Sequence, residues 1–121
     1  MKIRVYYEDT DSAGVVYHTK YIAFCERVRS EIFFQNGITF EKDGFVVRSL
    51  NSTFYSPAKL GDLLEVKTSV LSIKKSILTI SQKIYKFDKL IFEATIKLIY
   101  LKDWKINSIP KHYIDILSNI K

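Results

Sequence analysis

A change in hydrophobic periodicity divides the chain and limits the folds open to it. From about residue 17, apolar residues recur at helical spacing. They form a single stripe: Tyr21, Phe24, Cys25, Val28 and Ile32. Asn36 and Gly37 follow this stripe, and glycine is suited to the left-handed conformation that ends a helix. Between residues 44 and 101 apolar and polar residues alternate instead, as in half-buried strands. The sequence therefore predicts one long amphipathic helix and a largely β remainder.

Five strands are predicted, one before the helix and four after it. Their approximate ranges are 2–8, 45–55, 63–72, 76–86, and the segment between the 87–89 link and residue 101. Short links make consecutive strands antiparallel. A short helix is predicted after Pro110. One long helix needs one apolar partner, so we expect an α+β fold in which a curved antiparallel five-stranded sheet wraps around it. Such a sheet leaves its edges partly uncovered, which favours an oligomer.

Length, charge and cysteine content narrow the possible functions. The 121 residues suit a single domain over residues 1–121, and no apolar run approaches the ~20 residues that span a bilayer. We expect a cytoplasmic protein without membrane insertion. One cysteine, Cys25, and two distant histidines, His18 and His112, supply no metal site. The net charge of +6 suits nucleic acid, anionic lipid or a phosphate-rich small molecule, and the charge alone does not choose among them. A nucleic-acid-binding barrel of the OB type is disfavoured. Its main helix falls between the third and fourth strands, whereas the helix here follows the first, and basic and aromatic residues are not interleaved.

The segment before the long helix holds the residues best suited to chemistry. Glu8, Asp9 and Asp11 lie within four positions of one another, and Gly14 permits a close backbone approach. The free N–H groups of the helix start can hydrogen-bond a developing oxyanion. A carboxylate beside such a terminus suits ester or thioester hydrolysis. The same residue types also form turns and cap helices, so the residues alone leave both interpretations open.

Residues 9–21 resemble the signature of the hydroxybenzoyl-CoA thioesterase family, and within it the YbgC-type acyl-CoA thioesterases. That signature reads Asp-x-Asp-x-x-Gly-Val-Val-Tyr-His-x-x-Tyr, and it matches here without a gap. Residues 56–62 are also similar, and residues 74–76 more weakly. The resemblance implies a hotdog fold and hydrolysis of acyl-CoA without a cofactor or metal. It also implies a site between two subunits, in a homodimer or homotetramer.

The resemblance also implies roles for individual residues. Asp11 would act as nucleophile or as general base on water. The backbone N–H of His18 would polarise the thioester carbonyl, and its side chain would orient Asp11 or the water. Tyr7 would hydrogen-bond near the site, although a core or interface position would explain it equally well. The expected substrate-binding residues are Gly14, Val16, Tyr17, Lys59, Lys74, Lys75 and Ser76. The lysines among them would contact the phosphates of CoA.

Two alternatives stay open at this level. A hotdog module could bind acyl-CoA or acyl carrier protein without hydrolysing it, and acyl carrier protein is also a candidate partner of an enzyme. Some hotdog thioesterases place the catalytic carboxylate on the central helix, where Glu26 and Glu31 stand. The pattern around Asp11 argues against that arrangement. We expect these glutamates to support the helix by charge pairing, such as Glu26 with Arg29 or Ser30.

Overall fold

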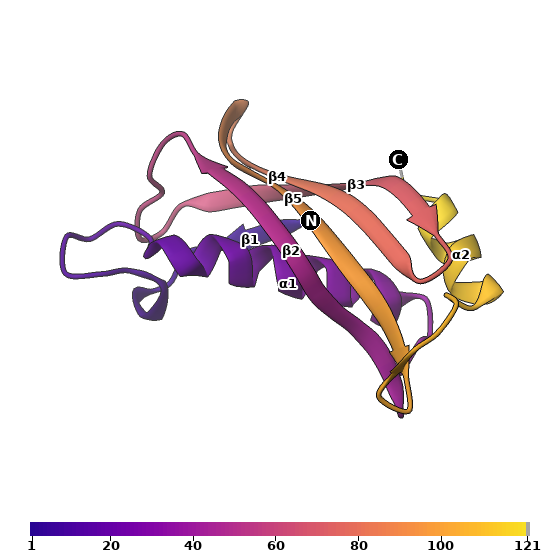
Figure 1. The fold of residues 1–121 in the computed structure, drawn as a ribbon. Helices are drawn as coiled ribbons and strands as arrows, with labels where there is room; N and C mark the ends of the chain where they lie inside the picture. The colour runs from indigo at the N-terminus through magenta and orange to yellow at the C-terminus, as the bar shows by residue number, and fades with distance from the viewer. Residues whose placement is uncertain (121) are drawn as a thin grey trace.

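A curved sheet folded over one long helix makes up most of the molecule, which is described by a computed structural model for residues 1–120 (Figure 1). The elements are β1 (Lys2–Arg4), the 3-10 helix η1 (Tyr7–Asp9), α1 (His18–Gln35), β2 (Asp43–Phe54), β3 (Leu63–Lys74), β4 (Ile77–Lys86), β5 (Lys89–Lys102), β6 (Lys105–Ile106) and α2 (Lys111–Ser118). The strand order is β1-β3-β4-β5-β2, with all pairs antiparallel and β6 added to β5. The predicted five-stranded sheet around a central helix is confirmed. The two-residue β6 was not predicted.

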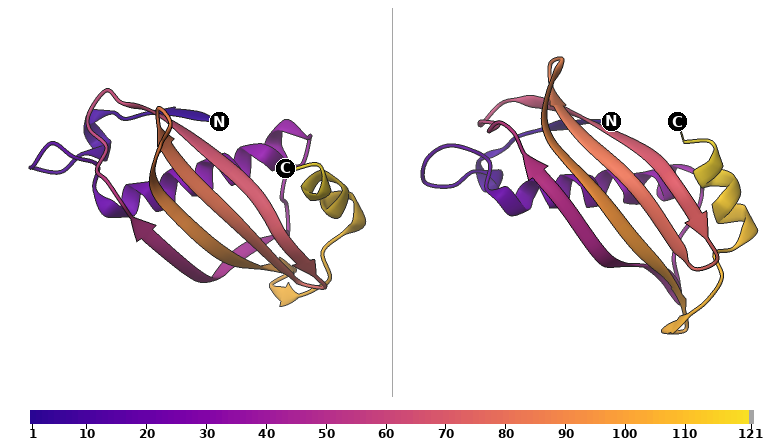
Figure 2. Two further views of the ribbon diagram at one scale, coloured as in Figure 1. Left: turned by 90° about the horizontal axis from the view of Figure 1, so that it is seen from above. Right: turned by 45° about the horizontal axis from the view of Figure 1, so that its top comes forward.

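The core forms where the apolar stripe of α1 meets the concave face of the sheet. The first four residues of the predicted stripe are buried, and Phe33 is buried as well. On β5 the alternation predicted from sequence is confirmed, because every second residue is buried: Phe92, Ala94, Ile96, Leu98 and Tyr100. The short helix predicted after Pro110 is α2, which buries Tyr113 and Leu117. Figure 2 shows α2 beside the end of the sheet that carries the β3–β4 turn, and the amide of Ile109 donates to the carbonyl of Lys75 there.

The first strand is shorter than predicted. It ends at Arg4, and the chain then enters η1, so Tyr7 and Glu8 are not strand residues. The cause is a local hydrogen bond, 2.9 Å long, that the amide of Tyr6 donates to the carboxylate of Asp9. Such side-chain bonds offer the backbone an alternative to a sheet ladder. The alternating pattern in the sequence continues to Glu8, but the strand itself ends at Arg4.

Strand β2 forms a long edge of the sheet. Within residues 1–120 it pairs with β5 alone, and a bulge sets Arg48 out of register with that partner. Helix α1 lies against it in the opposite direction: the ring of Phe33 packs 5.5 Å from Phe45, near the start of β2, while Tyr21 packs 5.7 Å from Phe54, at its end. The middle of α1 therefore lies near the middle of β2. No helix in the described part of the chain is long and apolar enough to cross a membrane.

Candidate active site

The motif forms a tight loop between η1 and α1. Thr10 and Val16 make an antiparallel bridge, and the amide of Asp11 donates to the carbonyl of Val15. The amide of Gly14 in turn donates to the carbonyl of Asp11 over 3.0 Å. Gly14 closes this turn at a φ of +81°, in the left-handed region that favours glycine. The loop is thus a small hairpin closed by its own hydrogen bonds.

Asp9 and Asp11 are two positions apart but have different environments. Asp9 is 2% exposed; besides the bond from Tyr6, its Oδ1 lies 3.8 Å from the ammonium of Lys20. The carbonyl of Asp9 accepts from the amide of Tyr17, which ties η1 to the start of α1. Asp11 is exposed, and its Oδ1 accepts only the amide of Ala13, at 2.9 Å. Asp9 is therefore the anchor of the loop, and Asp11 is the carboxylate available to a substrate.

The first turn of α1 presents unused hydrogen-bond donors beside this loop. Tyr17 is the N-cap, with extended backbone angles and no side-chain capping bond. Among the described residues, the amide groups of His18 and Thr19 have no protein acceptor. The exposed imidazole of His18 packs against the ring of Tyr17 and edge-on to Phe54. Free N–H groups at a helix start favour bound negative charge, including an oxyanion.

An aromatic floor lies below the helix start. Tyr21 stacks on Phe92 with the ring centroids 5.4 Å apart, and Phe54 packs against both. The amide of Ala58 donates to the Tyr21 hydroxyl over 3.0 Å. Burial raises the pKa of Tyr21, so this hydroxyl stays neutral near neutral pH. The site therefore combines an apolar floor with a carboxylate and free amides at its rim.

Some of the predicted ligand contacts lie beside this loop. Val16 is buried and its amide donates to the carbonyl of Ala58, while Tyr17 is 46% exposed. Lys59 is bridged to Val15, so it sits directly against the loop. Tyr7 is 80% exposed on η1, and its hydroxyl makes no hydrogen bond within residues 1–120.

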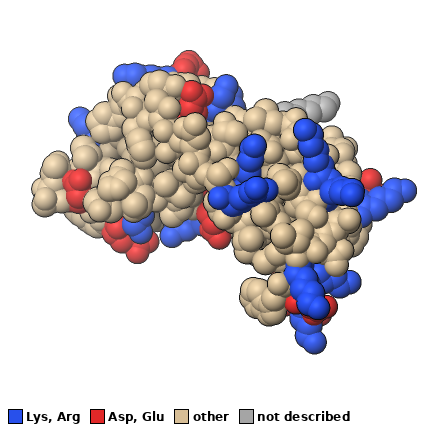
Figure 3. Space-filling model, viewed as in Figure 1, with Lys and Arg blue, Asp and Glu red and all other residues tan. Residues whose placement is uncertain are grey.

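The remaining predicted contacts lie at the far end of the sheet. Lys74, Lys75 and Ser76 form the β3–β4 turn, whereas the loop that holds Asp11 is tied to the segment just before β3. Strand β3 has 12 residues, so roughly 35 Å separates its two ends. Within one chain, these three residues are therefore not brought to Asp11. Figure 3 shows lysine and arginine side chains spread over this face of the molecule, some of them toward the end that carries α2.

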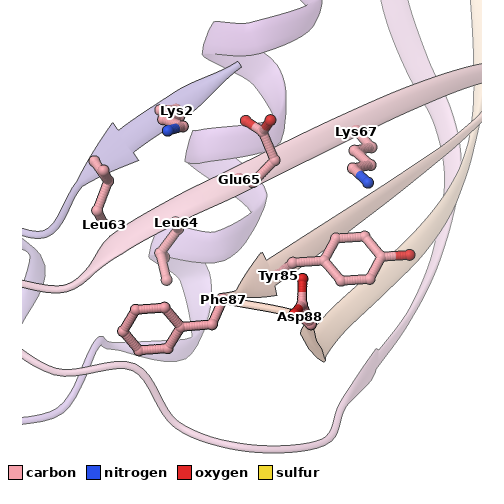
Figure 4. Close-up of a pocket in the computed structure, with 8 residues that line it drawn as sticks. All are labelled: Lys2, Leu63, Leu64, Glu65, Lys67, Tyr85, Phe87 and Asp88. Carbon is pink, nitrogen blue, oxygen red and sulfur yellow. The ribbon is translucent and has the colours of Figure 1, made fainter.

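An open hollow on the sheet lies away from the motif. It has a volume of about 600 Å³ and lies on the outer face of β3 and β4, where Lys67 and Tyr85 face it (Figure 4). Lys67 Nζ lies 4.9 Å from the centre of the Tyr85 ring, and Glu65 pairs with the N-terminal amine. The hollow is open and polar, and none of the predicted catalytic residues lines it.

The structure reveals two features that sequence reasoning missed. The first is the anchoring role of Asp9, for which a signal was present: an acidic side chain three residues after Tyr6 matches the pattern that caps a helical turn. The second is Ala58, whose amide fixes Tyr21 under the site. This contact joins the helix to the β2–β3 connection, far away in sequence, so no local sequence pattern predicts it.

Comparisons with known proteins find relatives in both sequence and fold. Residues 13–92 match the family model described as "Thioesterase superfamily". The chain is 38% identical over 120 residues to the acyl-CoA thioester hydrolase YbgC of Escherichia coli O6:H1, covering 93% of this chain and 90% of that protein. It is 54% identical over 72 residues to the acyl-CoA thioesterase YbgC of Helicobacter pylori; this match covers 58% of the chain and only 54%, about half, of that relative.

A solved structure extends the similarity to the whole fold. The probable thioesterase from Bartonella henselae superposes with a TM-score of 0.86 at 31% identity, covering 91% of this chain and 97% of that one. The family match, the sequence identity and the structural superposition lead to one conclusion. The chain belongs to the thioesterase superfamily and has its hotdog fold.

Proposed function

We propose that this protein is an acyl-CoA thioesterase that uses Asp11 as its catalytic carboxylate. The observation that carries the proposal is the pairing of an exposed carboxylate with unused amide donors at the start of α1, above an aromatic floor. Relatives named as acyl-CoA thioesterases support the substrate class. We assign the activity to the cytoplasm, where acyl-CoA is found.

The chemistry requires few groups. The carboxylate of Asp11 removes a proton from water as the water adds to the thioester carbonyl, or it attacks that carbonyl itself and gives an anhydride that water then opens. The amide of His18 stabilises the oxyanion, and its imidazole orients Asp11 or the water. The C–S bond then breaks and CoA leaves as a thiolate. Because a thiol pKa is near ~8.5, this leaving group needs no strong acid.

The direct experiment compares Asp11→Asn with the wild type. Loss of thioester absorbance is followed over a panel of acyl-CoAs that differ in chain length and aromaticity. We expect kcat to fall by about 10²–10⁴-fold, since a placed carboxylate contributes that much. Asp115→Asn, an exposed carboxylate on α2, is the matched control and should retain full activity. Equal rates for wild type and Asp11→Asn would eliminate the proposed role.

We further propose that the complete site lies between two copies of the chain. The unpaired β2 edge supports a dimer in which the two β2 strands run antiparallel and continue the sheet. Such a two-fold arrangement turns the far end of one sheet toward the loop end of the other. Lys74 and Lys75 of the partner subunit would then approach the Asp11 loop, where they can bind the phosphates of CoA together with Lys59. A tetramer would be a pair of such dimers.

Mixing two inactive variants tests this arrangement. Asp11→Asn is combined with the double variant Lys74→Glu and Lys75→Glu, and the subunits are exchanged. If the site is shared, each mixed dimer holds one intact site, and activity recovers to about a quarter of the wild-type value, because half of the dimers are mixed and each has one working site of two. If Asp11 and the lysines act within one chain, no activity returns.

A second candidate function is binding of acyl-CoA or acyl carrier protein without hydrolysis. The adjacent lysines at the β3–β4 turn, Lys74 and Lys75, favour an acidic or phosphate-bearing partner. Titration calorimetry with CoA and with acyl carrier protein addresses it. Tight binding together with no turnover of any acyl-CoA would replace the enzyme proposal.

A further inference from the structure

Arg29 on α1 is a half-buried cation that makes no ion pair within residues 1–120. One guanidinium nitrogen donates to Gln82 Oε1 over 3.3 Å. No carboxylate of the described chain lies within ion-pair distance of it, so the predicted pairing of Glu26 with Arg29 does not form. Burial lowers the pKa of Arg29, and the nearby charge of Glu26 only partly opposes this. A guanidinium has five donors, so most of its bonding capacity is unused in a single chain.

A buried polar side chain holds Arg29 in place. Gln82 is fully buried on the concave face of β4, among apolar neighbours on that strand. Its amide nitrogen donates to the carbonyl of Cys25 and to the hydroxyl of Thr68, so only its oxygen remains for Arg29. Because an unpaired buried amide would be costly, these bonds fix the position of Gln82. The guanidinium above it is thereby held at a defined place on the flank of α1.

This flank of α1 lies beside the β2 edge. Glu26 and Arg29 line a hollow of about 200 Å³ together with Gly44 and Phe45 of β2. Glu26 is exposed, so both a negative and a positive group border the same groove. A two-fold interface places the same patch of each subunit against the other, and such a patch must be complementary to itself. A patch with one charge of each sign meets that condition.

The direction of α1 sets which residues meet. Since the middle of α1 lies near the middle of β2, a two-fold axis through the centre of β2 also passes near the centre of α1. The two α1 helices then lie antiparallel on the same concave side, and residues at equal distances from their centres face each other. Glu26 lies just before the centre of His18–Gln35, and Arg29 lies on the other side, less than one turn beyond it. Glu26 and the partner's Arg29 are thus offset by only about 3 Å along the helices, which their long side chains can span, twice in each dimer.

We propose that Glu26 and Arg29 form two reciprocal ion pairs that hold two copies of this chain together. The proposal rests on the dimer of the proposed function and identifies what stabilises it. The unpaired β2 edge supplies the backbone pairing, and the ion pairs fix its register. A slip along β2 would bring like charges together, which costs far more than the loss of one attractive contact.

Charge reversal at Glu26 tests the proposal without disturbing the core. Dimer dissociation constants are measured by sedimentation equilibrium. Glu26→Arg places two arginines opposite each other, and we expect dissociation to be favoured by about 10²-fold or more. Glu31→Arg, an equal change at an exposed glutamate that does not line the hollow beside β2, is the matched control and should stay within about threefold of wild type. Urea unfolding of both variants checks that the monomers remain folded.

Restoration of complementarity provides the stronger test. In a mixture of Glu26→Arg chains with Arg29→Glu chains, both pairs are again of opposite sign, so we expect mixed dimers although neither variant dimerises well alone. If Arg29→Glu fails to fold, Glu26→Arg combined with Arg29→Met removes the repulsion within one chain and should recover most of the lost affinity. The proposal is overturned if the mixture forms no dimers. If Arg29→Glu fails to fold, it is overturned when the variant with Glu26→Arg and Arg29→Met recovers no affinity.

The two proposals can fail separately. A dimer of unchanged affinity in Glu26→Arg, with hydrolysis intact, overturns the ion pairs and leaves the thioesterase standing. A wild type that dimerises and responds to charge reversal as expected, but turns over no acyl-CoA, leaves the ion pairs standing and removes the enzyme. A monomeric wild type overturns the ion pairs whatever its activity.

Discussion

Asp43 links the C-terminal helix to the sheet, and its removal should be among the most damaging single changes outside the apolar core. Its Oδ2 accepts hydrogen bonds from the hydroxyls of Tyr100 and Tyr113, each 2.6 Å long. Both tyrosines are buried, whereas the carboxylate is partly exposed at the start of β2. In Asp43→Ala, two buried hydroxyls lose their acceptor at once.

The expected loss follows from these contacts. A hydrogen bond to a charged group is worth about 1.5–3 kcal/mol, and the partial exposure of Asp43 reduces this. We therefore expect Asp43→Ala to lower the free energy of unfolding by about 2–4 kcal/mol. Tyr113→Phe removes one of the two bonds and should cost about half as much. Asp115→Ala, an exposed carboxylate on α2, should change stability by less than about 0.5 kcal/mol.

Urea unfolding followed by circular dichroism measures these changes. With a slope of ~1.5 kcal/mol/M, a loss of 3 kcal/mol moves the midpoint by about 2 M. A midpoint for Asp43→Ala that matches Asp115→Ala would refute the reasoning, because it would mean that the two hydroxyls are satisfied without the carboxylate. Each variant is compared at one protein concentration, since the proposed dimer would add to apparent stability.

The same contacts set a pH dependence. Burial alone would raise the pKa of Asp43, but hydrogen bonds from Tyr100, Tyr113 and the amide of Glu41, with the nearby charge of Lys102, hold it below its usual value. The folded pKa is thus lower than the unfolded value of about 3.9. The stabilisation is complete above that unfolded value and is lost as pH falls through the folded pKa. The difference between wild type and Asp43→Ala should accordingly shrink in acid; a constant difference would contradict the assignment.

Three further outcomes are expected. Gly14→Ala should lower the free energy of unfolding by about 1–2 kcal/mol and lower activity, because φ is +81° at this position. The new Cβ would meet no atom, so the loss comes from the backbone conformation alone. Full activity with unchanged stability would show that the turn tolerates a side chain. Tyr21→Phe should cost about 1–3 kcal/mol by leaving the amide of Ala58 without an acceptor, and urea unfolding would reveal it. Burial raises the pKa of Cys25 to about 12, so a thiol reagent should modify the native protein far more slowly than the urea-unfolded protein; equal rates would show that the thiol is accessible.

Local periodicity was sufficient to predict the main elements of this fold. The helical stripe that begins near Tyr21 and the alternation around Ile96 depend only on neighbours in sequence, and both are confirmed. The same logic failed near Tyr7, where alternation continues but a hydrogen bond to Asp9 ends the strand. A side chain that competes for the backbone acts over a few residues and leaves no periodic trace.

The tertiary structure alone distinguished residues of the same type and set long-range distances. Asp9 and Asp11 are the same residue type, yet Asp9 is buried as an anchor and Asp11 faces solvent. The cause is the bridge between Thr10 and Val16, which closes the loop just after Asp9. Likewise, the length of β3 carries Lys74 away from Asp11, although both were predicted site residues. Sequence determines which segments become strand or helix through local periodicity and propensity. Which side chains end up as neighbours depends on strand length, register and symmetry, and those emerge only when the sheet closes over its helix.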